Sequence, residues 1–179
     1  MKMLALIAAL SVAASVPQDA GMPRPGKEHE TLQKQFEGEW TFEAKFFMDP
    51  AQPQEMTGTD SAKMGYGGFW ITSEIRGAMF GQPFEGRWTM TYDPLKKKYV
   101  GSWIDSMMPI LIVFEGEANP AGKVYTLIAD SVDPATLKPV KERYVIEVVS
   151  DEVHTMKFFS AGPDGKERNT GLITYRRKK

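Results

Sequence analysis

The first long strand pattern in the sequence lies at residues 40–46 and is WTFEAKF. Apolar residues at the even positions alternate with Thr, Glu and Lys at the odd positions. Successive side chains of a β-strand point to opposite faces of its sheet, so this alternation is typical of a strand with one buried face and one wet face. The stretch predicts a half-buried strand that begins near Glu39.

The same period of two returns along the rest of the chain. The predicted strands are Glu39–Met48, Thr57–Tyr66, Phe69–Arg76, Phe84–Tyr92, Lys98–Ser106, Ile110–Ala118, Lys123–Ser131, Val140–Val149, Val153–Ser160 and Arg168–Arg176. Short turn sequences such as Gly67-Gly68 and Asp93-Pro94 separate them. None of these gaps is long enough for the crossover that parallel neighbours need, so consecutive strands are predicted to be antiparallel.

A sheet of about ten strands rarely stays open, because its two unpaired edges promote aggregation. Closure into a barrel removes both edges. The sequence therefore predicts an all-β fold, an up-and-down antiparallel β-barrel of about ten strands, with a two-sheet sandwich as the alternative. A short helix is predicted over Glu28–Phe36, where Leu32 and Phe36 share a face and Gly38 is placed to end it. This helix is expected to cap one end of the barrel.

The N-terminal segment has the features of a signal peptide. Lys2 precedes an apolar stretch from Leu4 to Ala14, and small residues follow it. The stretch is shorter than the roughly 20 residues that cross a bilayer, so a permanent anchor is the weaker alternative. We predict an exported protein, periplasmic or secreted. Its predicted parts are a signal peptide at 1–15, a flexible leader at 16–27 and one lipocalin-like barrel domain at 28–179.

Composition excludes several classes of site. The 179 residues carry a formal net charge of -1, which gives no basic field for nucleic acid, and they include no cysteine for a disulfide, a thiolate nucleophile or a zinc–thiolate site. His29 and His154 lie far apart, and the carboxylates lack metal-binding spacing. We predict no metal, no cofactor, no nucleic-acid partner and no stable membrane insertion of the mature chain. The oligomeric state is left open.

Two positions near the ends of the predicted sheet carry a family resemblance. Gly38-Glu39-Trp40 opens the first strand behind the helix, and Arg176 lies near the end of the last strand. This resembles the G-x-W signature of calycins, the lipocalin-like barrels, in which an Arg of the closing strand lies over that Trp. The resemblance implies a latch between Trp40 and Arg176, and such a contact contributes about 0.5 to 2 kcal/mol. The alternative is a core Trp40 and an exposed Arg176.

A series of motifs along nearly the whole chain carries a second resemblance. The motifs are Glu28-His29 with Leu32, Gly38-Glu39-Trp40, Gly67-Gly68, GQPFEG at 81–86, Tyr92-Asp93, Lys97-Lys98-Tyr99, WIDSM at 103–107, GPDGKE at 162–167 and ITYR at 173–176. Their order and spacing resemble domain-of-unknown-function family 1579, a family of bacterial exported proteins. The family is similar to calycin barrels and has no agreed activity, so the resemblance implies architecture alone. Phe69 and Thr91 depart from its pattern, which commonly has Arg and Gly there.

The strands Phe84–Tyr92 and Lys98–Ser106 carry the densest set of candidate site residues. Trp103 and Asp105 share one face of their strand, which places a carboxylate among aromatic rings if that face is interior. Arg143 is the predicted interior cation. As alternatives, Asp105 and Arg143 form a buried ion pair or face solvent, and the aromatic side chains only fill the barrel.

The preferred functional hypothesis is a barrel that binds a small, mainly apolar ligand in its interior. The predicted ligand-binding residues are Trp88, Tyr92, Tyr99, Trp103, Asp105 and Arg143. A second hypothesis is an enzyme that uses Asp105 as its catalytic general acid or base. A third is a structural envelope module without a pocket. The sequence leaves open whether the protein is an enzyme.

Overall fold

The computed structural model describes residues 21–47, 52–133, 138–162 and 164–179. The predicted signal peptide at 1–15 lies outside these residues, as do positions 16–20 of the predicted leader. No helix within the described ranges is long and apolar enough to cross a membrane.

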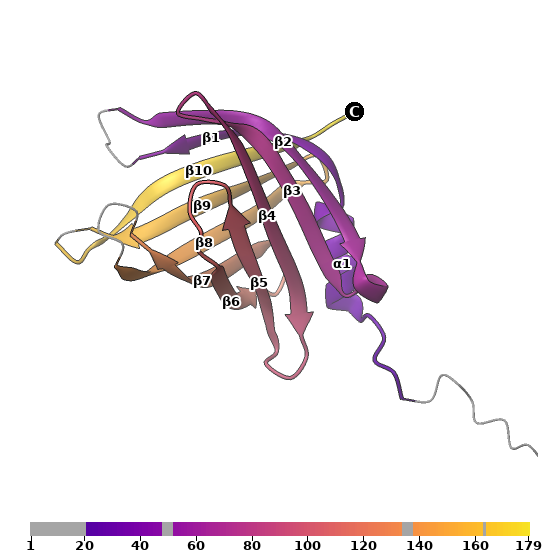
Figure 1. Ribbon diagram of the computed structural model, residues 1–179. Helices are drawn as coiled ribbons and strands as arrows, with labels where there is room; N and C mark the ends of the chain where they lie inside the picture. The colour runs from indigo at the N-terminus through magenta and orange to yellow at the C-terminus, as the bar shows by residue number, and fades with distance from the viewer. Residues whose placement is uncertain (1–20, 48–51, 134–137, 163) are drawn as a thin grey trace, which may run out of the picture.

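The described residues form one α-helix and ten strands (Figure 1). Their bounds are α1 Lys27–Phe36, β1 Gly38–Phe46, β2 Gln54–Gly65, β3 Trp70–Met79, β4 Gln82–Asp93, β5 Lys98–Asp105, β6 Ile112–Ala118, β7 Val124–Val132, β8 Pro139–Ser150, β9 Val153–Ala161 and β10 Glu167–Arg177. Each strand pairs antiparallel with its neighbours in sequence, and β10 pairs with β1. The predicted up-and-down barrel is confirmed, and the sheet is closed rather than split into a sandwich.

Alternation of side chains across the barrel wall builds the core. In β1, Trp40, Phe42 and Ala44 are buried, while the residues between them face water. Inward side chains from the other strands meet them inside the barrel, as the period of two in each strand requires. The interior therefore follows directly from the sequence pattern.

Helix α1 lies at one end of the barrel (Figure 1). Leu32 and Phe36 are buried on its inner face. The indole Nε1 of Trp40 donates a hydrogen bond of 2.9 Å to the carbonyl oxygen of Phe36. This bond ties the end of α1 to the start of β1 and fixes the helix as a cap.

The contact between the first and last strands involves Arg177 and not the predicted Arg176. The Cζ of Arg177 lies 4.1 Å from the centre of the Trp40 ring, and its Nη1 donates to the carbonyl oxygen of Glu37 at 2.7 Å. Tyr175 is buried in β10, so Arg177 shares its inner face, whereas Arg176 points outward and is exposed. A cation does lie over Trp40 and join the last strand to the first, but it belongs to Arg177 and not to the predicted Arg176.

Candidate ligand-binding cavity

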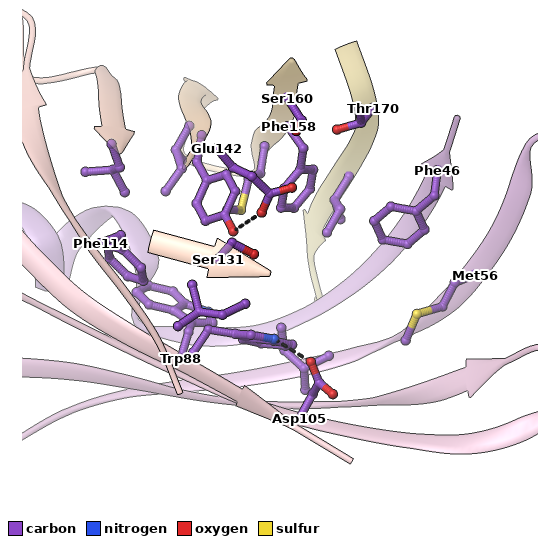
Figure 2. A pocket seen from close by; sticks show the side chains of 18 of the residues that line it. Phe46, Met56, Trp88, Asp105, Phe114, Ser131, Glu142, Phe158, Ser160 and Thr170 are labelled. Carbon is purple, nitrogen blue, oxygen red and sulfur yellow. Dashed lines mark hydrogen bonds between the residues drawn. The ribbon is translucent and has the colours of Figure 1, made fainter. Parts of the chain in front are cut away.

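The barrel encloses a cavity of about 670 Å³. The side chains that line it are mostly aromatic and aliphatic (Figure 2). Phe36 brings α1 into this lining. At the end opposite α1 the cavity reaches the surface. The residues that border it there include Met107, Met108, Asp133, Ala161 and Gly162. The cavity is thus closed by the helix at one end and open at the other.

Trp103 of β5 forms part of the cavity wall, and three contacts hold its ring in place. Its Nε1 donates to Asp105 Oδ2 at 2.7 Å, and its ring stacks on Phe84 with centroids 6.2 Å apart. The indole also packs closely against β4 at Gly86, where an added Cβ would be 2.2 Å from its Cη2. Only glycine leaves room for the ring at that position.

Asp105 holds the Trp103 ring through this hydrogen bond. Besides the indole, its carboxylate accepts hydrogen bonds from the backbone amides of Met107 at 2.7 Å and Met108 at 3.1 Å. These bonds also shape the loop that follows β5, at the open end of the cavity. Trp88, Trp103 and Asp105 are therefore brought to the cavity as predicted from the sequence.

A second carboxylate, that of Glu142 in β8, lines the opposite wall (Figure 2). Its Oε2 accepts a hydrogen bond of 2.9 Å from the hydroxyl of Tyr144. Burial, together with the charge of Glu142, raises the pKa of Tyr144, so this phenol stays protonated as the donor. Ser131 and Ser160 add hydroxyl groups near this wall.

Tyr92 and Tyr99 are not among the residues that line this cavity. Both side chains point inward but lie beneath α1, where their rings are 5.2 Å apart and Tyr99 is 4.9 Å from Tyr125. The hydroxyl of Tyr125 donates to Gln35 Oε1 at 2.6 Å. Tyr92 and Tyr99 instead border a smaller pocket of about 420 Å³ beside the helix. Their depth along the barrel, and not their face, separates them from Trp88 and Trp103.

The prediction of Arg143 as an interior cation is wrong. On β8 the buried face carries Tyr144 and Ile146, so Arg143 points outward. Its Nε and Nη2 bind the two carboxylate oxygens of Glu167 at 2.9 and 2.5 Å, and its Cζ lies 4.0 Å from the ring centre of Phe159. Arg143 therefore fastens β8 to β10 across β9 on the outer surface.

Sequence reasoning missed a buried carboxylate, that of Asp60 in β2. It is 2% exposed and accepts a hydrogen bond from the Ser73 hydroxyl. Burial raises the pKa of Asp60 to about 6, although hydrogen bonds from Ser73 and Trp88 oppose that rise. The period of two could have found it, because Asp60 shares its face with the buried Met56 and Ala62.

His154 of β9 lies at the inner end of the cavity and is 5% exposed. Its ring stacks on Tyr175 at 4.4 Å and meets the ring of Trp40 at 4.5 Å. Among the described residues, its Nδ1 has no hydrogen-bond partner. Burial, followed by the positive charge of Arg177, lowers the pKa of His154 to about 3, so the imidazole is neutral at neutral pH.

Among the described residues, no three His, Asp or Glu side chains are grouped to hold a metal ion. The interior offers aromatic surface, hydroxyls and carboxylates. Such a lining supports the binding of an organic molecule by its apolar body and by a few polar contacts.

Comparison with known proteins gives a family match and a shared fold. A family model described as "Protein of unknown function (DUF1579)" matches residues 24–177. No protein with a curated description matches the chain. Among solved structures, Rv2717c from M. tuberculosis is 12% identical to this chain with a TM-score of 0.59. The match covers 86% of this chain and 99% of Rv2717c. The S-type phycobiliprotein lyase CPES from Guillardia theta is 14% identical with a TM-score of 0.57, covering 85% and 96%. These likenesses show the barrel fold alone.

Proposed function

Because this chain belongs to DUF1579, a family of unknown function, we propose its function from its cavity: the barrel binds a small, mainly apolar molecule. The observation that carries this proposal is the cavity of about 670 Å³ with its aromatic and aliphatic lining. Pockets for small organic ligands typically measure about 300 to 1,000 Å³ and combine apolar walls with few polar groups. A protein that needed only a stable barrel would gain from filling this space, since interiors are normally close-packed.

The wall of the cavity supports a binding role further. Trp103 is held by a hydrogen bond, a ring stack and close packing on Gly86, so it presents a fixed surface before any ligand arrives. Fixed aromatic surfaces bind with little loss of side-chain entropy. Asp105 already accepts bonds from three donors of the chain, which favours a positioning role over proton transfer. The cavity also weakens the case for a structural module without a pocket.

We propose in addition that the barrel functions outside the cytoplasm. The support is the apolar segment from Leu4 to Ala14 behind Lys2, which has the pattern of a cleaved signal peptide. N-terminal sequencing of the protein purified from the periplasm or the medium tests this part. A chain that begins at Met1 and stays in the cytoplasm would contradict it.

Titration with N-phenyl-1-naphthylamine, a neutral apolar dye, tests the binding role. We expect a saturable rise in dye fluorescence with one dye molecule per barrel. The Ser131→Phe variant places a ring in the cavity and is expected to weaken dye binding at least tenfold. The matched control is Ile128→Phe on the same strand, where the side chain is 42% exposed on the outer face.

Circular dichroism must first show that both variants are folded. If Ser131→Phe does not fold, Ser160→Phe offers a second position in the cavity wall. Dye binding that never saturates, or that is equally strong in the wild type and in a folded cavity-filling variant, would reject the proposed function. Native mass spectrometry of protein from its own source then identifies the molecule that the cavity retains.

A further inference from the structure

The charged side chains that line the cavity are mostly acidic. Asp105, Asp133 and Glu142 contribute carboxylates, and Arg168 contributes the one guanidinium among the described lining residues. The side chain of Arg168 is 61% exposed, and its Nη2 already pairs with Asp164 Oδ2 at 3.0 Å. Its positive charge is therefore both partly neutralised and screened by water at the edge of the cavity.

Asp105 and Glu142 face the cavity from opposite walls, as Figure 2 shows. The donors found for them are neutral: an indole and two amides for Asp105, and a phenol for Glu142. In the described part of the chain, no Lys or Arg forms an ion pair with either carboxylate. A charge in this mainly apolar cavity interacts strongly with any ionic group that enters.

Aromatic rings stand beside both carboxylates. Trp103 stands next to Asp105 with its plane fixed, and Tyr144 and Phe158 lie beside Glu142 with ring centroids 5.1 Å apart. The face of an aromatic ring attracts a cation and repels an anion. Carboxylates and ring faces therefore favour the same sign of charge on a ligand.

We propose that the ligand of this cavity is an apolar molecule that carries an ammonium group, with the ammonium near Glu142 and Asp105. This inference rests on the proposed binding function and names its ligand class. A fatty acid would bring a further negative charge into a cavity that carboxylates already line. Among the described lining residues, the one guanidinium is that of Arg168, which is exposed and paired with Asp164.

Three probes with the same alkyl chain test the inference: dodecyltrimethylammonium, dodecanol and dodecanoate, each below its micelle concentration. Displacement of bound N-phenyl-1-naphthylamine at neutral pH gives the three dissociation constants. We expect the ammonium to bind about tenfold more tightly than dodecanoate, with dodecanol between them. Raising the salt concentration is expected to reduce that ratio.

The Glu142→Gln variant is expected to lower the ratio of ammonium to dodecanoate affinity by about threefold to tenfold. The matched control is Glu147→Gln, which removes an exposed carboxylate from the outer face of the same strand and is expected to leave the ratio unchanged. Equal or tighter binding of dodecanoate by the wild type would overturn the ammonium class while leaving the binding function intact. If the dye binds saturably but none of the three probes displaces it, the ammonium class is likewise overturned, whereas a dye that does not bind saturably rejects the proposed function itself.

Discussion

Arg177 lies over the indole of Trp40 and so fastens the last strand of the barrel to the first. Its Nη1 and Nε also donate to the carbonyl oxygens of Glu37 and Asp151. One side chain thus joins the end of α1, β1, β10 and the β8–β9 turn.

Loss of this side chain is expected to weaken the closure. Arg177→Ala removes the cation–π contact and two hydrogen bonds, so the free energy of unfolding should fall by about 2 kcal/mol. Arg176→Ala, one residue earlier and exposed, should change it by less than about 0.5 kcal/mol. Urea denaturation of both variants measures the difference. A loss for Arg177→Ala no larger than that for Arg176→Ala would show that the contact of Arg177 with Trp40 adds no stability.

Asp60 makes the barrel less stable as the pH rises. Its pKa is raised from 3.8 to about 6, so the folded state holds the proton more tightly than the unfolded chain does. Its contribution to stability is largest below about pH 4 and is lost as the pH rises through about 6. The stability of Asp60→Asn minus that of the wild type should therefore increase by roughly 3 kcal/mol across this window. Urea denaturation at several pH values measures this difference, and Asp130→Asn on the outer surface is the control. A flat difference for Asp60→Asn would show that the carboxylate is hydrated.

His154 acts in the opposite direction. Its pKa is lowered from 6.5 to about 3, so the unfolded chain takes up a proton before the folded barrel does. Stability from the neutral imidazole is present above about pH 6.5 and is lost as the pH falls toward 3. From about pH 7 to about pH 5, the wild type should lose about 2 kcal/mol relative to His154→Phe, which keeps a ring between Tyr175 and Trp40. Thermal unfolding across this range checks the sign. Over the same fall in pH, Asp60 gains stability as it takes up its proton. A measurement on the wild type by itself therefore shows a smaller loss than the comparison with His154→Phe.

Phe80 occupies a strained turn. It forms a two-residue hairpin loop with Gly81 between β3 and β4, its φ is 52°, and its side chain is 59% exposed. Left-handed backbone costs a phenylalanine roughly 1 to 2 kcal/mol, whereas Asn accepts it readily in such turns. Phe80→Asn should therefore raise the free energy of unfolding by about 1 kcal/mol in urea. A decrease would show that the ring of Phe80 stabilises the turn by packing.

Gly86 leaves the space that the Trp103 ring occupies. Gly86→Ala places a Cβ where the indole now lies, so the ring must move toward the cavity and strain its bond to Asp105. We expect a loss of about 1 to 3 kcal/mol in stability and weaker binding of N-phenyl-1-naphthylamine. Gly65→Ala is the matched control, because an added Cβ there meets no atom within 4 Å. Unchanged dye binding in Gly86→Ala would mean that the indole does not form part of the binding wall.

The strands and their closure could be predicted because alternation is a local property of each segment. The ten predicted strands all occur, and the helix ends at Phe36 as expected. The same parity would also have distinguished Arg177 from Arg176 and placed Arg143 outside, since Tyr175 and Tyr144 mark the buried face of their strands. Arg176 was chosen because it fits the calycin pattern, and Arg143 was chosen because an interior cation was sought. In both strands the alternation of buried and exposed residues pointed to the correct face.

Depth along the barrel was not available from the sequence. Trp88 and Tyr92 share a face of β4, yet Trp88 lines the cavity and Tyr92 lies under α1. Depth depends on how the strands are staggered around the whole closed sheet, which no single segment encodes. For the same reason the sequence could not show that the carboxylates of Asp105 and Glu142 face each other across one space.

The position of α1 has a consequence for exchange. Because Leu32 and Phe36 are buried on the inner face of the helix, α1 blocks its end of the barrel to a molecule held in the cavity. Entry and release are therefore expected at the end that Met107 borders. A bound molecule then has to leave before another can take its place, so the rate of release limits the rate of exchange.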